Sequence, residues 1–490
     1  MQFLAELLIL SYFSIHFAHA QNIFPDHFRL GVASASYQIE GGWNASDKGE
    51  NIWDRLTHEH PEVIKDNSTG DVACDSYHLW KKDVEILKNL GVDYYRFSIS
   101  WTRLLPTGRV DKISSDGLKY YNDLIDSLLE NKIEPVVTLY HWDLPQALQY
   151  FGGWTNLITS DFFAQYARLV FSRFGDRVKT WITINEPYSI CETTYGDFQG
   201  APLIHSPGIG DYLCGKTILV AHSKAFHIYD KEFREKQGGK IGITIDTIWA
   251  EPRTNKSEDV EAAEREMQMS FGWWAHPIFS TNGDYPEIMK SRIEERSRQE
   301  NFVESRLPSF TKEEILNLRG SADFLGLNHY NTKLISNTEF PIGEPSFQKD
   351  KGTSAFQDPN WKPNKHTVPW GFRKLLNWIK REYDNPLVYI TENGFPDEGQ
   401  LQDVGRVIFH KEMMKAMLQA IGDGCNIQSY TVWSIMDNME WRDGYTIKFG
   451  LYQVDFNNPN RTRTPKASAK FFKTVIETRT IPENITMFIE

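Results

Sequence analysis

Short apolar runs and longer amphipathic stretches alternate along this chain. The apolar runs are rich in β-branched and aromatic residues, which is typical of buried strands, and the stretches between them carry apolar residues at helical spacing. Eight strands alternating with helices predict an α/β protein built as a single (β/α)8 TIM barrel, with long loops at the C-terminal face, rather than two or more separate domains. The expected strands are residues 28–38, 94–101, 133–142, 180–187, 240–247, 322–330, 387–394 and 429–434, and the main expected helices are 75–90, 118–130, 161–174, 216–235, 260–271, 370–383, 405–422 and 466–477.

Two of the expected strands end on a glutamate, Glu186 in the fourth and Glu392 in the seventh. Pro187 has no N–H to continue a ladder, so the fourth strand should stop where Glu186 appears. A single Glu after a strand is usually a solvated loop residue, but two of them, each beside an Asn and each ending an apolar strand, favour a shared site. Cleavage of a glycosidic bond requires such a pair: one carboxyl group protonates the leaving oxygen, and the other attacks the anomeric carbon or activates a water.

The predicted topology gathers other polar residues around this pair. In a (β/α)8 barrel the carboxyl ends of the strands and the loops that follow them form the active site. The longer expected loops are residues 39–75, 188–215 and 331–369. We therefore expect one cavity formed by the residues at the strand ends, namely Gln38, His141, Asn185, Glu186, Tyr330, Glu392, Trp433 and Glu440.

Residues 1–20 have most features of a secretory leader. Residues 7–17 form an apolar core too short to span a bilayer, and residues 18–20 (Ala-His-Ala) form a small-residue cleavage site, although the segment before the core has no Lys or Arg. We expect the mature domain to be residues 21–490, secreted and extracellular. A glycoprotein is consistent with the glycosylation sequons at Asn44, Asn67, Asn255, Asn460 and Asn484.

Charge and cysteine content exclude some classes of partner. A net charge of -12 argues against nucleic acid, whose phosphates require a basic face, and no second apolar stretch is long enough to span a membrane. The four cysteines match no metal-binding spacing, so we expect no metal and no other cofactor. The pairing of Cys74, Cys191, Cys214 and Cys425 stays open: Cys191 and Cys214 could form a disulfide in the loop after the Glu186 strand, and buried free thiols are the alternative.

Seven motifs carry a family resemblance over essentially the whole chain after the leader. Through them the chain resembles the family 1 glycoside hydrolases, the β-glucosidase family, and in particular its secreted insect β-glucosidases and thioglucosidases. The motifs are FRLG at 28–31, ASYQIEG at 35–41, RFSISW at 96–101, HWDLP at 141–145, NEP at 185–187, TENG at 391–394, and the stretch from Trp433 to Trp441.

The resemblance implies a retaining mechanism with Glu186 as general acid/base and Glu392 as nucleophile. The negative charge of Glu392 and partial burial should then raise the pKa of Glu186 in the free enzyme. Arg96 and Asn328 are expected to support the nucleophile, and Tyr330 to hydrogen-bond it as well as contact substrate. The resemblance further assigns Asn185 to the sugar 2-hydroxyl, Gln38, His141, Glu440 and Trp441 to the other glycone hydroxyls, and Trp433 to a platform under the ring.

Two positions depart from the family pattern. Met439 stands where the family usually has an aromatic residue, and Lys448 stands where Arg is common. Both bear on the placement of the glycone, and neither is one of the two carboxylates.

The expected substrates are β-glucosides, such as plant glucosides or cello-oligosaccharides. The alternative is a thioglucosidase of the myrosinase type, acting on glucosinolates. Their sulfate calls for basic residues at the aglycone end of the site, where Lys333 is a candidate and Glu192 is unfavourable. Plant thioglucosidases of this family have Gln in place of the acid, whereas Glu186 is present here. A non-catalytic binding barrel is disfavoured because both carboxylates are retained, and oligomeric state stays open, with a homodimer as one option.

Overall fold

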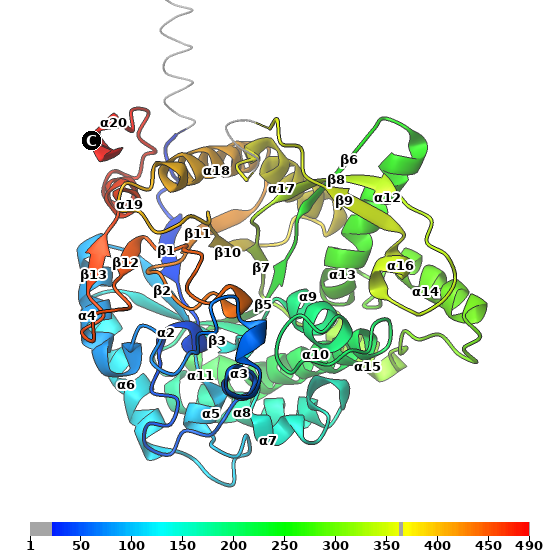
Figure 1. The fold of residues 1–490 in the computed structure, drawn as a ribbon, viewed down its shortest axis with the longest axis horizontal. Coiled ribbons are helices and arrows are strands. Elements are labelled where there is room, and N and C mark those ends of the chain that lie inside the picture. Colours follow the sequence, from blue (N-terminus) through cyan, green and yellow to red (C-terminus); the bar gives the residue numbers. More distant parts are fainter. Residues whose placement is uncertain (1–21, 362–365, 490) are drawn as a thin grey trace, which may run out of the picture.

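Eight parallel strands close into a barrel in the computed structural model, which describes residues 22–361 and 366–489 (Figure 1). The expected leader, residues 1–20, lies outside the described residues. All eight predicted strands are present, and the fold class is confirmed. In barrel order the strands are β1 (Arg29–Ala33), β11 (Ile427–Trp433), β10 (Val388–Asn393), β7 (Phe324–Asn328), β5 (Lys240–Asp246), β4 (Thr180–Asn185), β3 (Glu134–Tyr140) and β2 (Tyr94–Ser98).

Helices surround the barrel and cover its outer surface with apolar faces. In α17 the residues at i, i+3, i+4 and i+7, from Phe372 to Ile379, are buried, which is the spacing of one helix face. Helix α4 ends where Gly91 adopts φ 79°, as the sequence predicted. The longer helices are α4 (Ser76–Leu90), α6 (Ser115–Glu130), α8 (Thr159–Phe174), α10 (Gly210–Ile228), α12 (Ser257–Met267), α14 (Glu287–Gln299), α17 (Pro369–Glu382), α18 (Val404–Gly422) and α19 (Ala467–Thr478).

Shorter helical segments fill the connections. Several of them follow barrel strands directly, so they lie at the face where the site was predicted. They are α2 (Ser36–Ile39), α3 (Ile52–Glu59), α5 (Trp101–Leu104), α7 (Gln146–Gln149), α9 (Pro187–Ile190), α11 (Arg234–Gln237), α13 (Trp273–Phe279), α15 (Lys312–Leu318), α16 (Phe347–Lys351), α20 (Thr486–Ile489) and the 3₁₀ or π segments η1 (Pro61–Val63), η2 (Gly153–Thr155), η3 (Cys191–Gly196), η4 (Tyr229–Phe233), η5 (Gln268–Gly272) and η6 (Trp441–Asp443).

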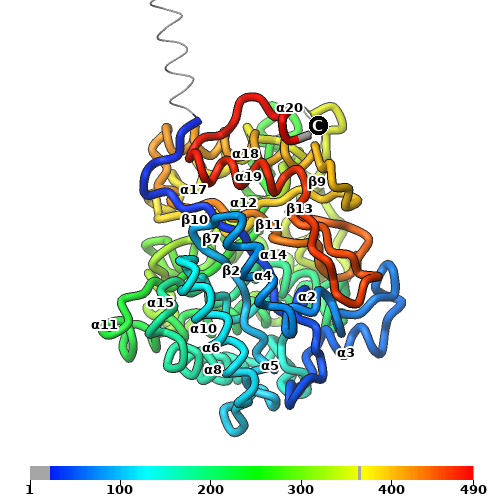
Figure 2. The backbone as a smooth tube through the Cα atoms, turned by 90° about the vertical axis from the view of Figure 1, so that its left-hand side faces the viewer, coloured from blue at the N-terminus to red at the C-terminus, as the bar shows by residue number. Residues whose placement is uncertain are grey.

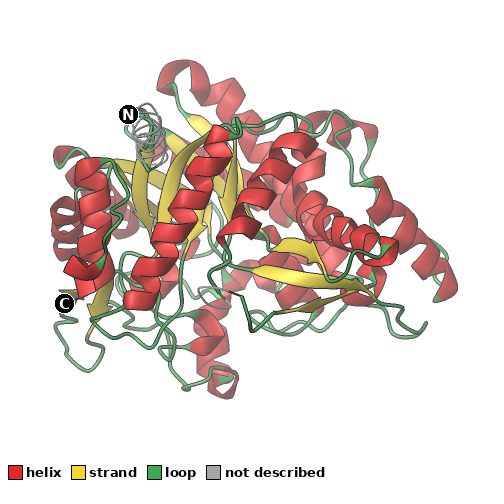
Figure 3. Ribbon diagram, turned by 90° about the horizontal axis from the view of Figure 1, so that it is seen from above, coloured by secondary structure: helices red, strands yellow, loops and turns green. Residues whose placement is uncertain are grey.

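Two small sheets lie outside the barrel. Strands β6 (Trp249–Pro252), β8 (Thr332–Asn337) and β9 (Thr353–Phe356) form a three-stranded sheet that packs against α12, beside the barrel (Figures 1 and 3). Part of residues 331–369, expected as an irregular loop, is therefore strand. The second sheet is the hairpin β12 (Tyr452–Val454) and β13 (Arg463–Pro465). These strands are short and partly exposed, so their apolar pattern is too weak to predict them.

The two ends of the described chain lie side by side, as the blue and red ends of the tube in Figure 2 show. Ile23 pairs with Thr480 in an isolated bridge, and Phe24 N–H donates to the carbonyl of Arg479 at 2.9 Å. Within residues 22–361 and 366–489, no helix is both long enough and apolar enough to cross a membrane.

A disulfide joins Cys191 to Cys214, across 23 residues of sequence. This pairing is one of the two options that the sequence left open. It ties η3, which follows the Glu186 turn, to the buried helix α10. Cys74 and Cys425 are free and buried.

Removing the disulfide that links η3 to α10 should lower the stability of the protein. The double variant Cys191→Ser, Cys214→Ser is expected to lose about 3 kcal/mol of unfolding free energy, because its unfolded chain is no longer cross-linked. Thermal unfolding under non-reducing conditions measures the loss as a lower Tm. Cys425→Ala, which removes a thiol but no cross-link, is the control, and an equal fall in its Tm would contradict the explanation.

Candidate active site

A cavity of about 370 Å³ opens at the carboxyl ends of the barrel strands. Glu186 and Glu392 both face it, as the sequence predicted. Its walls also contain residues from the loop after β11, which was not among the longer loops expected from the sequence. The lining residues are His141, Trp142, Glu186, Tyr330, Asn331, His366, Glu392, Gly394, Pro396, Trp433, Glu440, Trp441 and Phe449.

Glu186 stands at a sharp turn in the backbone. Strand β4 ends at Asn185, and Pro187 begins α9, so the chain reverses at Glu186 with φ 53° and ψ 68°. A non-glycine residue in this left-handed region is uncommon and is held there by its surroundings. Here the Glu186 N–H donates to the carbonyl of Thr244 on β5 at 2.9 Å. The turn thus fixes the direction in which the carboxyl group leaves the barrel.

Glu392 is held at both oxygens. Arg96 Nη1 donates to Oε1 at 2.6 Å, and the Tyr330 hydroxyl donates to Oε2 at 2.7 Å. Both side chains of the Arg96–Glu392 ion pair are almost fully buried. Charge-assisted hydrogen bonds of this kind favour the ionised carboxylate and fix its orientation. Arg96 and Tyr330 therefore lie where the family resemblance implies.

Asn185 connects Arg96 to His141. Its Oδ1 accepts from Arg96 Nη2 at 2.6 Å and from Asn328 Nδ2 at 3.2 Å, so its Nδ2 faces His141 Nε2, 3.1 Å away. Because burial lowers the pKa of His141 well below its usual value, the imidazole is neutral and carries its proton on Nδ1. Nδ1 has no hydrogen-bond partner among the described residues. His141 thus offers one donor to a ligand hydroxyl.

Gln38 and Glu440 form a second polar group. Gln38 Nε2 donates to Asn438 Oδ1 and to the Met439 carbonyl at 2.9 Å, and to Glu440 Oε2 at 3.2 Å. The remaining oxygens, Oε1 of Gln38 and of Glu440, are buried with no partner in the described part of the chain. Buried polar atoms are normally hydrogen-bonded, so these oxygens are suited to accept from ligand hydroxyls. Burial, followed by the charge of Glu392, raises the pKa of Glu440 to about 8.

Aromatic rings form the apolar part of the site. The His141 ring stacks on Trp433 at 5.7 Å between centroids, and Trp441 packs on Trp142 at 4.5 Å. Trp441 also stacks on Tyr37 at 6.0 Å. Flat aromatic faces of this kind pack against the C–H faces of sugar rings.

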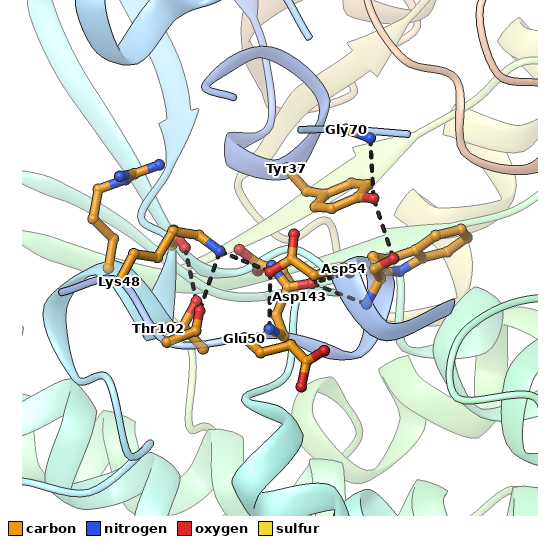
Figure 4. Close-up of polar contacts among 12 residues, drawn as sticks. Tyr37, Lys48, Glu50, Asp54, Gly70, Thr102 and Asp143 are labelled. Carbon is orange, nitrogen blue, oxygen red and sulfur yellow. Dashed lines mark hydrogen bonds and ion pairs between the residues drawn. The ribbon is translucent and has the colours of Figure 1, made fainter. Parts of the chain in front are cut away.

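A layer of buried polar contacts includes Tyr37 and the residues around it (Figure 4). The Tyr37 hydroxyl donates to a backbone carbonyl at 3.2 Å, and Lys48 Nζ donates to Asp54 Oδ2 at 2.8 Å with both side chains buried. Burial raises the pKa of the nearby Asp143 carboxyl to about 7. The layer fixes Tyr37, on which Trp441 packs.

Asn328 connects the strands of both carboxylates. It lies beside Glu392, its register partner on β10, and its Oδ1 accepts from Thr391 Oγ1 at 2.7 Å. Its Nδ2 donates to Glu186 Oε1 at 2.6 Å, a contact that the sequence did not predict. Asn328 therefore supports the expected acid/base.

The pKa of Glu186 is raised well above its usual value. Burial is the main cause, followed by the charges of Asp246 and then Glu392. The direction agrees with the expectation from sequence, but Asp246, the last residue of β5, was not among the predicted site residues. Its only sequence signal was an acidic residue at the end of an apolar strand.

The residues that departed from the family pattern lie outside the cavity walls. Met439 is buried, and its backbone carbonyl accepts from Gln38, so the position still serves the Gln38 site. Lys448 and Lys333 are not among the described residues that line the cavity. Glu192 is also absent from that lining, and burial raises its pKa.

A (β/α)8 barrel with two glutamates facing one cavity at the carboxyl ends of its strands defines a glycoside hydrolase. The model of glycosyl hydrolase family 1 matches residues 20–481. The chain belongs to this family.

The similar proteins include a myrosinase and a β-glucosidase. Myrosinase 1 of Brevicoryne brassicae is 49% identical over 462 residues, which cover 93% of this chain and 98% of that protein. The structure of an aphid myrosinase has a TM-score of 0.90 at 49% identity, covering 93% of this chain and 99% of that chain. A rice β-glucosidase mutant in a covalent complex with Glc has a TM-score of 0.87 at 38% identity, covering 92% and 98%.

Removing the Asn328 amide should raise the pKa of Glu186 further, because its hydrogen bond favours the ionised form. Asn328→Ala is expected to shift the alkaline limb of the kcat/KM profile to higher pH by about one unit. The measurement is the pH dependence of kcat/KM on an aryl β-glucoside. A limb that stays in place, or moves to lower pH, would contradict this role for Asn328.

Proposed function

We propose that this chain is a retaining β-glucosidase, with Glu186 as general acid/base and Glu392 as nucleophile. The observation that carries the proposal is the opposite treatment of two carboxyl groups in one cavity. Glu392 accepts two strong hydrogen bonds that favour its charge, whereas burial and neighbouring carboxylates favour a proton on Glu186. Pairs of carboxyl groups separated in this way take the two roles of glycoside hydrolysis.

In the first half of the reaction, an oxygen of Glu392 bonds to the anomeric carbon as the bond from that carbon to the aglycone oxygen breaks. Glu186 gives its proton to the departing oxygen. The aglycone leaves as an alcohol, Glu392 becomes an ester, and Glu186 becomes a carboxylate.

In the second half, water attacks the anomeric carbon and gives a proton to Glu186. The ester bond to Glu392 breaks, so the nucleophile returns as a carboxylate and the sugar leaves with its original anomeric configuration. Support for a covalent step comes from the similar rice β-glucosidase mutant, which is in a covalent complex with Glc.

The residues that remain in the cavity wall suit a neutral sugar and an uncharged aglycone. His141 in the wall offers a donor and Glu440 a carboxyl oxygen, while Gln38, which is not among the described lining residues, has a free amide oxygen next to Glu440; this is the pattern that reads sugar hydroxyls. The rest of the wall is mainly aromatic or uncharged, including Trp142, Phe449 and other residues outside the polar set. Among the described residues, no Lys or Arg lines the cavity.

The second candidate function is a thioglucosidase acting on glucosinolates, favoured by the 49% identity to Myrosinase 1. Against it stands the described cavity wall, which contains the Glu392 carboxylate and two further carboxyl groups, Glu186 and Glu440, but no Lys or Arg. A sulfate group near them gains no cationic partner from that wall. We therefore rank the β-glucosidase first.

We also propose that the protein is secreted. The support is the leader-like segment at residues 1–20, the glycosylation sequons and the disulfide Cys191–Cys214, since disulfides persist mainly in oxidising compartments.

Replacing the nucleophile should abolish turnover without unfolding the protein. Glu392→Gln is expected to lower kcat on an aryl β-glucoside by at least about 10⁴-fold, because the amide cannot form the ester. Mass spectrometry of the wild-type protein with a 2-deoxy-2-fluoro β-glucoside should find the sugar attached to Glu392. If NMR shows α-glucose as the first product, or Glu392→Gln keeps its activity, the proposed mechanism is wrong.

A panel of four substrates separates the two candidate functions. An aryl β-glucoside, an aryl β-galactoside, cellobiose and a glucosinolate are compared by kcat/KM under the same conditions. The neutral β-glucosides are expected to be preferred over the glucosinolate by at least about tenfold, because the described wall offers a sulfate no cation. Preference for the glucosinolate would instead establish the thioglucosidase.

A further inference from the structure

Asp246 lies where it can act on Glu186. It ends β5, the strand between β4 and β7. Two residues earlier, the Thr244 carbonyl accepts the Glu186 N–H at 2.9 Å, and Asp246 itself is in register with Asn328, whose amide donates to Glu186 Oε1. Strand residues two apart point to the same side, and the Thr244 hydroxyl points inward to β10. Asp246 therefore points to the end of the barrel that carries Glu186.

The Asp246 carboxyl group is only half satisfied. Its Oδ2 accepts a hydrogen bond from Ser189 Oγ at 3.1 Å, and its Oδ1 is buried with no partner among the residues that the structure describes. Ser189 belongs to α9, the helical turn that begins directly after Glu186. One short segment thus carries both the expected acid/base and the donor that stabilises a charge on Asp246.

The charges around this pair are mostly negative. Glu392 faces both carboxyl groups from β10, and Glu192 acts on Asp246 from η3. Among the described residues, Arg96 from β2 is a cation that acts on Glu186, and it already bonds Glu392 and Asn185. The phenols of Tyr188 and Tyr330 are further titratable groups beside the pair. Within the described chain, Asp246 therefore has a hydroxyl group as its partner rather than a cation.

We propose that Asp246 is a positioning residue whose carboxylate increases the affinity of Glu186 for a proton in both halves of the reaction. This inference rests on the roles proposed above for Glu186 and Glu392. Asp246 forms no bond to the substrate in this scheme. Its effect reaches the reacting atoms only through Glu186.

The hydrogen bond from Ser189 favours a charge on Asp246. Glu186, which has its own hydrogen bond from Asn328, lies nearer to Glu392 and is more strongly disfavoured as an anion. Burial raises the pKa of Asp246 to about 7, and the Ser189 hydroxyl opposes that rise. Asp246 is thus the group that takes the charge, and Glu186 is the group that keeps the proton.

The effect of Asp246 outlasts that of Glu392. When Glu392 becomes an ester, its negative charge disappears and no longer raises the pKa of either neighbour. Asp246 is not consumed in the reaction, so its charge still acts on Glu186 in the intermediate. It follows that Asp246 helps Glu186 as an acid in the first half and makes Glu186 a stronger base in the second half.

The test is the pair of pH profiles of Asp246→Asn, which removes the charge while keeping the acceptor for Ser189. The alkaline limb of kcat/KM on 4-nitrophenyl β-glucoside reports the loss of the proton from Glu186 in the free enzyme. With 2,4-dinitrophenyl β-glucoside, a pre-steady-state burst first shows that hydrolysis of the intermediate is rate-limiting. The acid limb of kcat on this substrate then reports the ionisation of Glu186 as the base. Both limbs are expected to move to lower pH, by about one unit.

Three further variants separate this effect from structural damage. Asp246→Glu keeps the charge and should restore both limbs toward the wild-type pH. Asn328→Ala should move the alkaline limb of kcat/KM in the opposite direction. If Asp246→Asn does not fold, Ser189→Ala provides the test, because loss of its hydroxyl leaves Asp246 less ionised and should also lower the alkaline limb.

Two results would overturn the inference. The first is an active Asp246→Asn protein with both limbs unmoved, and the second is an equal loss of rate at every pH on both substrates. Failure of the proposed function looks different, because the wild-type protein would then show no turnover of β-glucosides or Glu392→Gln would remain active.

Discussion

The site depends on one buried cation among several carboxyl groups. Glu186, Glu392 and Glu440 line one cavity, and Asp246 lies beside it, while Arg96 is the guanidinium that bonds within this set. Several buried negative charges are unstable together unless some of them are protonated or paired. Arg96 and Tyr330 give their hydrogen bonds to Glu392, so Glu392 can be charged while Glu186 and Glu440 hold protons. The division of labour between acid and nucleophile follows from that uneven distribution of donors.

The sequence predicted the barrel well because its strands are buried on both faces. Such strands read as continuous apolar runs, and the residue after each run marks the end of the barrel that holds the site. For this reason Glu186 and Glu392 were found from their neighbours alone, before any family was considered. The sheet formed by β6, β8 and β9 was missed because its strands are short and half exposed.

The contacts that the sequence did not predict depend on which neighbouring strands the side chains reach. Asn328 was expected beside Glu392 and is its register partner, but its hydrogen bond to Glu186 was not predicted, and Asp246 was not considered at all. Both residues end a strand, but only the order of strands around the barrel tells which carboxyl group each one meets. In the loop after β11, Phe449 was not predicted to line the cavity, and Trp441 was predicted only from the family resemblance, because strand periodicity does not extend into this loop.

The paired ends of the chain have a practical consequence for the use of this enzyme. Ile23 precedes β1 and Thr480 follows α19, so both ends lie at the barrel face where the strands begin, opposite the cavity. A tag, a fused module or a solid support attached at either end would leave the mouth of the cavity unobstructed. The same adjacency makes the chain a good scaffold for circular permutation, because a short linker can join the old ends and new ends can open in an exposed loop.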